Sequence, residues 1–124
     1  MKQKISTVAI ALCLFVTAPA ASAHTALIST NPVVGSIIKE LPVQIILKFA
    51  DPLLTLGKRV VNRVKVIAPN GQVISLNKNQ THGSTLVNGI KTSSPHNGIY
   101  KVSYRVSAED GHVVTGTYTF TLKN

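Results

Sequence analysis

The sequence predicts an all-β fold, a single-domain antiparallel β-sandwich with Greek-key connections that follows an N-terminal signal peptide. Apolar and polar residues alternate along most of residues 24–124, and no stretch places apolar residues at helical spacing over three turns. Turn-forming residues recur about every ten positions, which is typical of sandwiches built from roughly seven short strands. No internal repeat or linker divides the region, so one domain is expected.

The first 23 residues have the layout of a secretory signal peptide. A basic start, MKQK, precedes an apolar run of about a dozen residues, which is shorter than the roughly 20 needed to span a bilayer. Small residues follow, and Ala21-Ser22-Ala23 fits the A-x-A cleavage pattern. We therefore expect residues 1–23 to be removed after Ala23, so that the mature domain, residues 24–124, begins with His24.

The mature domain is expected to carry no thiol and a strong positive charge. The only cysteine, Cys13, lies in the leader, and Leu12 before it argues against lipid attachment, which needs a small residue there. A domain of this length can form a core without disulfides. Loss of Lys2 and Lys4 lowers the formal charge from +9 to about +7. The basic residues are spread singly and aromatic residues are few, so nucleic-acid binding is not expected.

Strands are expected where the alternation is clearest, at residues 26–29, 43–49, 59–68, 72–76, 85–90, 99–107 and 115–122. Turns or loops are expected between them, at residues 31–35, 50–58, 69–71, 77–84 and 91–98. Pro69-Asn70-Gly71 should join its two flanking strands into a hairpin.

The same alternation predicts which side chains face the core. They are Val43, Ile45, Leu47 and Phe49 in the second strand, Tyr100, Val102, Tyr104 and Val106 in the penultimate one, and Tyr118, Phe120 and Leu122 in the last. Tyr100 follows Gly98 closely and is expected to anchor its hydroxyl on neighbouring backbone, as in sandwiches with a tyrosine corner.

The segment AEDGHVV, residues 108–114, concentrates acid and imidazole groups in a chain that has only four acidic residues. It joins the last two predicted strands and so should lie at one end of the sandwich. Asp110 and His112 are two residues apart, and Gly111 between them allows the backbone to bend so that the two side chains converge. Such a pair more often consists of solvated loop residues than of metal ligands. A further donor group is needed before a metal site is the better interpretation.

The predicted cleavage supplies that second group. A histidine at the first mature position, His24, offers its α-amino nitrogen and its Nδ1 to one ion as a six-membered chelate. Nitrogen pairs of this kind, together with another imidazole and a carboxylate, favour the tetragonal field of Cu(II). Since Asp51 and Asp110 could concentrate negative charge at such a site, a divalent cation could approach a domain of positive net charge.

Four segments give the mature chain a resemblance to the CopC family of periplasmic copper-binding proteins. They are HTALISTNPVVGS, LPVQIILKFAD, NGIYKVSYRV and SAEDGHVVTGTYTFTL, and the last carries the D-x-H motif. The resemblance implies an immunoglobulin- or cupredoxin-like sandwich that binds one Cu(II) per chain through His24, Asp51, Asp110 and His112. It further implies a monomeric, non-enzymatic, periplasmic carrier or buffer in copper homeostasis or resistance, with an inner-membrane transporter of the CopD type as a candidate recipient.

Three departures from the family pattern bear on this expectation. Asp51 stands where the family has a glutamate, which favours an indirect role for this shorter side chain. Tyr104 replaces a tryptophan in the penultimate strand. The methionine-rich loop that holds Cu(I) in some members is missing, because Met1 is the only methionine and belongs to the leader. A Cu(II)-only protein is therefore expected.

The other candidate residues have simpler interpretations. His82 and His96 lie in polar segments without a nearby acid and are interpreted as solvated loop histidines, and Glu109 as a surface residue. Asp51, which precedes Pro52, could equally be a turn-forming residue.

Two other functions remain open at the level of sequence. Copper-dependent polysaccharide monooxygenases also use a terminal histidine, but they are usually longer and expose aromatic residues, whereas this chain has no Trp. An immunoglobulin-like structural module without metal would suit residues 31–52, but it would need neither a histidine at the first mature position nor the D-x-H loop.

Overall fold

A computed structural model describes residues 25–92 and 94–124, and these residues form strands and loops without a helix. The strands are β1 (Leu27–Asn31), β2 (Ile37–Ile38), β3 (Gln44–Phe49), β4 (Arg63–Ile67), β5 (Val73–Leu76), β6 (Gln80–His82), β7 (Thr85–Lys91), β8 (Gly98–Ser107) and β9 (Val113–Leu122). The predicted signal peptide, its cleavage site and His24 lie outside the described residues. In the part of the chain that is described, no helix is long and apolar enough to cross a membrane.

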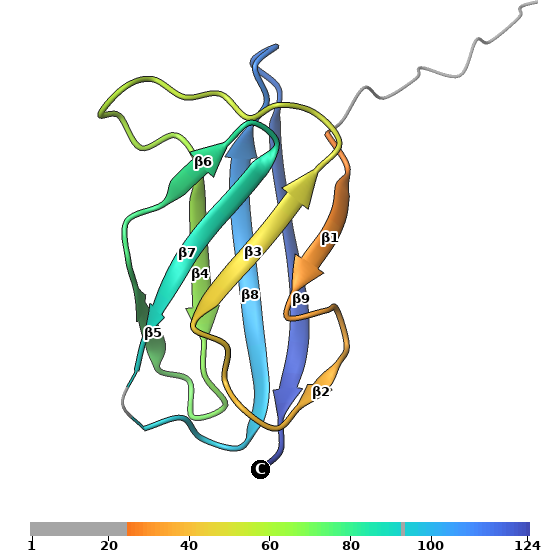
Figure 1. Cartoon of the computed structure of the whole chain (residues 1–124), viewed down its shortest axis with the longest axis vertical. Coiled ribbons are helices and arrows are strands. Elements are labelled where there is room, and N and C mark those ends of the chain that lie inside the picture. The colour runs from red at the N-terminus through yellow and green to blue at the C-terminus, as the bar shows by residue number, and fades with distance from the viewer. Residues whose placement is uncertain (1–24, 93) are drawn as a thin grey trace, which may run out of the picture.

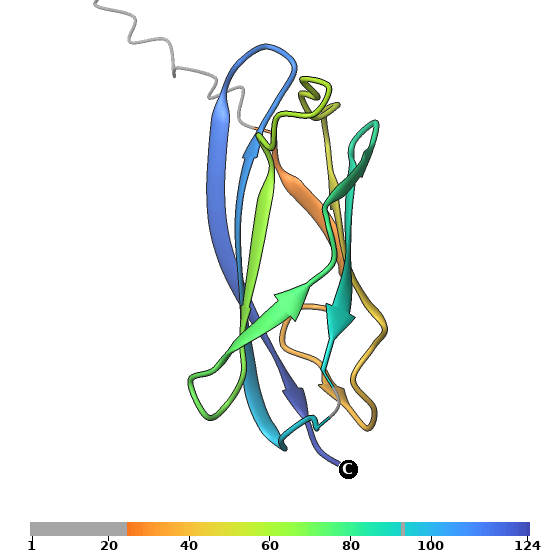
Figure 2. The ribbon, with the colours of Figure 1, turned by 90° about the vertical axis from the view of Figure 1, so that its left-hand side faces the viewer.

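The strands form a two-layered sandwich, which confirms the predicted fold class (Figures 1 and 2). One layer contains β1, β3, β7 and β6, and the other contains β4, β8, β9 and β2. Strand β5 joins the layers because it pairs with β4 on one side and β7 on the other. Neighbours such as β1–β3, β3–β7 and β4–β8 are not consecutive in the chain, so the chain crosses repeatedly between the layers.

The inner faces of the two layers bury the side chains that the alternation predicts. Ile45, Leu47 and Phe49 of β3 are at most 1% exposed, while Lys48 between them points to solvent. In β8 and β9, the buried apolar residues are Tyr100, Val102, Val106, Tyr118, Phe120 and Leu122. Burial of aromatic and branched apolar side chains is the main favourable contribution to folding of such a domain. The prediction was wrong for Val43, which precedes β3 and is 78% exposed.

The boundaries of three segments differ from the sequence prediction. β4 begins at Arg63 rather than Arg59, because Arg59 closes a turn by donating its N–H to the Leu56 carbonyl. Polar residues 80–82 form β6 instead of a loop, because β7 supplies a pairing edge for them. Ile37 and Ile38 of β2 pair in parallel with the end of β9, whereas only antiparallel pairs were predicted. In the last two cases, strand pairing overrides the local pattern.

Two tyrosines of β8 fix the core between the layers. The Tyr100 hydroxyl donates to the His96 carbonyl (2.9 Å) and accepts from the His96 backbone N–H (3.0 Å), so the predicted tyrosine corner is confirmed. Tyr104 packs edge-on against Phe49, with ring centroids 5.5 Å apart. Its cross-strand partner is Gly116, where a Cβ atom would overlap the Tyr104 ring. Tyr104, which is partly buried, therefore packs against the core at the position where the CopC resemblance implies a tryptophan.

Three chain segments meet at one end of the sandwich, opposite the C-terminus (Figures 1 and 2). They are the start of β1, the connection from β3 to β4, and the turn between β8 and β9. All the acidic residues of the chain except Glu40 lie in these segments, and of the predicted site residues so do Asp51, Asp110 and His112.

Candidate metal centre

The turn between β8 and β9 is compact because backbone hydrogen bonds join residues within it. The Ala108 N–H donates to the His112 carbonyl (2.8 Å), and the Gly111 N–H donates to the Ala108 carbonyl (2.9 Å). Gly111 has φ +89°, in the region that only glycine adopts without strain. The turn thus brings the residues on either side of Gly111 into contact.

Asp110 and His112 form a hydrogen-bonded pair at the tip of this turn. One carboxylate oxygen of Asp110 lies 2.7 Å from Nδ1 of His112, and the other accepts the His112 backbone N–H at 3.0 Å. A carboxylate only accepts hydrogen bonds, so Nδ1 carries the proton, and Nε2 of the neutral ring retains its lone pair. The two side chains are 54% and 60% exposed, so Nε2 belongs to a ring that is open to solvent.

This arrangement keeps Asp110 ionised. The backbone N–H of His112, and then its imidazole, lower the pKa of Asp110 below its ordinary value. An ionised Asp110 can hold the ring of His112 in one orientation over a wide range of pH. This is the usual role of a carboxylate that bonds to the far nitrogen of a metal-binding histidine.

Asp51 occupies a different position, at the start of the connection after β3. Its carboxylate accepts a hydrogen bond from the Thr25 hydroxyl at 2.7 Å, and Thr25 is only 2% exposed. The Ala50 N–H donates to the Ala26 carbonyl in the same region (2.8 Å). Asp51 therefore ties down the residue that directly follows His24 in the chain, and one of its oxygens is engaged in doing so.

The Asp51 segment is also bonded to the turn of β8 and β9. Leu53 and Ala108 form an isolated antiparallel bridge, and the Glu109 N–H donates to the Pro52 carbonyl (3.1 Å). The Leu54 N–H donates to the Ser107 carbonyl (2.8 Å). These hydrogen bonds hold three parts of the chain at the same end of the molecule: the segment around Asp51, Thr25, and the Asp110–His112 pair.

The described residues contain no group of three or more His, Cys, Asp or Glu side chains placed to hold a metal ion. The structure brings Asp110 and His112 together and leaves Asp51 bonded to Thr25. His82 and His96 are exposed, although His82 lies in β6 rather than in a loop, and Glu109 is a surface residue as predicted. The predicted donors of His24 lie outside these residues.

Two residues that position the site were missed in the sequence. Thr25 had no signal of its own, because its hydroxyl bonds to a carboxylate 26 residues away. Asn62 is 3% exposed, accepts the Ser107 N–H (3.0 Å) and donates to the Leu54 carbonyl (3.0 Å), which holds the β3–β4 connection against the end of β8. The available signal was that Asn62 is in phase with Val64 and Val66 in an alternating segment, since a buried amide must find partners.

The chain is thus a one-domain β-sandwich with a paired carboxylate and imidazole exposed at one end. A protein-family model described as "CopC domain" matches residues 27–123, so the chain belongs to the CopC family. The earlier resemblance, drawn from four sequence segments, is confirmed. No curated protein matches the sequence significantly.

Three solved structures share this fold. CopC from Methylosinus trichosporium OB3b superposes with a TM-score of 0.66 at 20% identity, covering 81% of this chain and 94% of that protein. The selenomethionine form of PcoC, a copper resistance protein from Escherichia coli, gives 0.65 at 24% identity, covering 79% and 99%. PcoC described as a methionine-rich copper resistance protein from Escherichia coli gives 0.63 at 26% identity, covering 82% and 100%. The fold is thus that of the CopC and PcoC structures.

Proposed function

We propose that the mature chain is a periplasmic Cu(II)-binding protein that carries or buffers copper in copper homeostasis or resistance. It would bind one Cu(II) per chain, act as a monomer and catalyse no reaction of its own. Membership of the CopC family supports a role with copper, as does the likeness to a copper resistance protein at 26% identity. The ion is the cargo of such a protein rather than a catalytic cofactor.

The hydrogen bond between Asp110 and Nδ1 of His112 is the observation that carries the proposal. It leaves Nε2 of an exposed, oriented imidazole as a metal donor. Thr25, bonded to Asp51 at the same end of the sandwich, directly follows the predicted terminal His24. The proposed donors are Nε2 of His112 with the α-amine and imidazole of His24, which suit the tetragonal preference of Cu(II).

The two carboxylates have distinct proposed roles. Asp110 orients the His112 ring, because both of its oxygens are engaged by His112. Asp51 positions the N-terminal segment through Thr25. Both also contribute negative charge to an otherwise basic domain, which favours the approach of a divalent cation.

Selectivity for Cu(II) over Cu(I) follows from the donors that the mature chain lacks. Cys13 and Met1 are the only sulfur-containing residues, and both precede the predicted cleavage site. Soft sulfur ligands are what select Cu(I). This chain therefore differs from the relative described as methionine-rich. The proposed recipient of the copper is an inner-membrane transporter of the CopD type.

The test is N-terminal sequencing of the exported protein followed by copper titration. Sequencing should return His24 as the first residue, and titration should give one Cu(II) per chain with the electron paramagnetic resonance signal of a tetragonal nitrogen and oxygen site. Under reducing conditions, Cu(I) should not bind measurably. Tight Cu(I) binding, or a mature protein that starts elsewhere, would contradict the proposal.

A further inference from the structure

The outer face of β4 and β8 carries a row of exposed cations that the proposed copper site does not use. The row consists of Arg63, Lys65, Lys101 and Arg105. Arg63 and Arg105 are cross-strand partners in the β4–β8 ladder. Like charges directly opposite one another destabilise a pair of strands. Within residues 25–92 and 94–124, no carboxylate lies within 4.0 Å of either guanidinium, since the ion pair found there joins Asp110 to His112.

An open hollow of about 470 Å³ lies beside this arginine pair. It is lined by Arg59, Val60, Val61, Arg63, Arg105 and Ser107, so three arginines and no acidic residue line it. The β4 and β8 segments that line it are held together by buried Asn62, which accepts the Ser107 N–H at 3.0 Å. We call this feature the arginine hollow.

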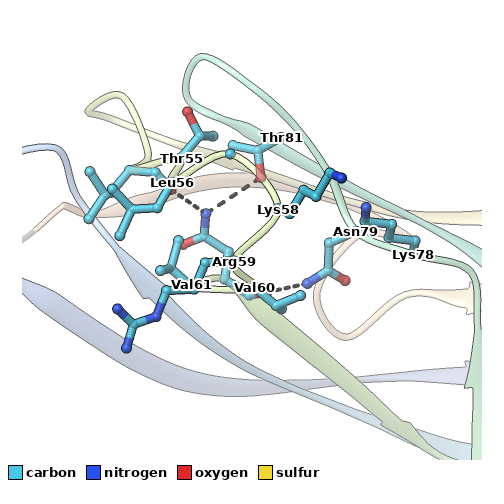
Figure 3. Close-up of a pocket in the computed structure, with 12 residues that line it drawn as sticks. Thr55, Leu56, Lys58, Arg59, Val60, Val61, Lys78, Asn79 and Thr81 are labelled. Carbon is cyan, nitrogen blue, oxygen red and sulfur yellow. Dashed lines mark hydrogen bonds between the residues drawn. The ribbon is translucent and has the colours of Figure 1, made fainter.

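A second hollow adjoins the arginine hollow and is also lined by basic residues (Figure 3). It measures about 230 Å³ and is lined by Lys58, Arg59 and Lys78, together with apolar and amide side chains. Asn79, which Figure 3 shows, donates its side-chain amide to the Asn62 carbonyl. The two hollows share residues 59–61, so Arg59 borders both of them, whereas Lys58 and Lys78 line only the second. Among their lining residues there is neither an acid nor a histidine, so neither hollow is the candidate metal centre.

We infer that the arginine hollow binds a phosphate-type oxyanion through Arg59, Arg63 and Arg105. Each planar guanidinium can donate two parallel hydrogen bonds to such an anion, which lysine cannot do. A bound anion would supply the negative charge that the Arg63–Arg105 pair lacks. The anion has two possible sources with the same chemistry, free inorganic phosphate and the headgroup of an anionic phospholipid.

The hollow lies close to the candidate metal centre along the chain. Arg105 is three residues before Ala108, where the turn of Asp110 and His112 begins, which corresponds to roughly 10 Å of extended strand. A lipid headgroup in the hollow would therefore hold the metal-binding end of the sandwich near a bilayer. Anion binding itself does not depend on copper, so it can be tested on metal-free protein.

The first experiment titrates metal-free mature protein with inorganic phosphate at constant ionic strength and follows backbone amide shifts by NMR. Shifts should concentrate at residues 59–63 and 105–107. Arg63→Gln and Arg105→Gln should each weaken phosphate binding by about tenfold. Lys48→Gln is the matched control, because it removes one exposed positive charge from β3 in the other layer and should change nothing.

Thermal unfolding separates loss of the site from loss of the fold. Without phosphate, Arg105→Gln should melt at or above the temperature of the parent protein, because a like-charge pair has been removed. At one phosphate concentration, the melting temperature should rise in the parent and in Lys48→Gln, and should rise less in the two arginine variants.

Vesicles distinguish the two sources of the anion. Co-sedimentation with phosphatidylglycerol vesicles but not phosphatidylcholine vesicles, lost in Arg63→Gln and Arg105→Gln and kept in Lys48→Gln, would identify a phospholipid headgroup. Phosphate binding that is weakened in Arg63→Gln and Arg105→Gln but not in Lys48→Gln, without any vesicle binding, would identify the free anion. Absence of binding to both probes, or an equal loss in all three variants, would overturn the inference.

Discussion

The turn at residues 108–112 and the loop at residues 54–62 lie at the same end of the sandwich and are opposite in charge. The turn carries Glu109 and Asp110 beside His112, whereas the loop carries Lys58 and Arg59 and no acid. The Leu54 N–H donates to the Ser107 carbonyl, so a hydrogen bond joins the loop to β8, the strand that leads into the turn. The proposed cation site and the proposed anion site therefore lie close together at one end of the domain.

The two regions are also stabilised in different ways. The hydrogen bonds that shape the turn lie mostly within five residues, from Ala108 to His112 and from Asp110 to His112, and one further bond joins the Glu109 N–H to the Pro52 carbonyl. The loop is held by Asn62, whose side chain reaches Ser107, 45 residues away. Changes in the turn should therefore act on metal binding with little effect on stability, while changes at the base of the loop should do the reverse. The predictions below test this separation.

The largest effect is expected from adding one alanine before His24 of the mature protein. The nitrogen of His24 then becomes an amide, which has no basic lone pair at neutral pH, whereas a free α-amine has a reference pKa near 7.7 to 8.0. Cu(II) affinity should fall by several orders of magnitude, because the chelate ring through the α-amine can no longer form. The melting temperature without metal should not change. Unchanged affinity in a competition titration would remove the terminal amine from the site.

His112→Ala should have the next largest effect, because it removes the exposed imidazole that Asp110 orients. The loss of Cu(II) affinity should exceed the 10- to 100-fold that is typical when only an outer partner of a ligand is removed. His82→Ala and His96→Ala are matched controls, since both histidines are exposed and lie in β6 and in the loop before β8. Equal losses from all three substitutions would show that the wrong histidine has been chosen.

Asp110→Ala should weaken Cu(II) binding by about 10- to 100-fold, because His112 loses the partner that fixes its ring and its tautomer. Asp51→Asn should cost less than about tenfold, because an amide oxygen can still accept the Thr25 hydroxyl. Both values come from the same competition titration. If Asp51→Asn proves the more damaging, the roles of the two carboxylates are reversed.

The smallest effect on copper is expected from Asn62→Ala, which should instead destabilise the fold. The substitution leaves the Ser107 N–H and the Leu54 carbonyl without their partner. The free energy of unfolding should fall by about 1–3 kcal/mol, measured by denaturant titration, while Cu(II) affinity changes by less than about tenfold. Asn97→Ala is the control, because its exposed side chain bonds to Asn124 near the C-terminus. A larger loss of copper affinity than of stability would show that the two regions are not separable.

Much of this molecule could be predicted from the sequence because the signals are local. Alternation in 43–49, 99–107 and 115–122 gave the buried faces of β3, β8 and β9 correctly, apart from Val43. The D-G-H order placed Asp110 and His112 in one turn, since a glycine at φ +89° lets neighbouring side chains meet. The tyrosine corner at Tyr100 likewise depends on residues only four apart.

Other features were decided by tertiary structure alone, because they depend on partners distant in the chain. Parallel pairing of β2 with β9, and a β6 strand of polar residues, arise from the edges that β9 and β7 offer. The bond of Asp51 to Thr25 spans 26 residues, and that of Asn62 to Ser107 spans 45. The pairing of Arg63 with Arg105 follows from strand register. Local alternation specifies which face of a strand is buried, but only folding decides which strands become neighbours and which charges meet across them.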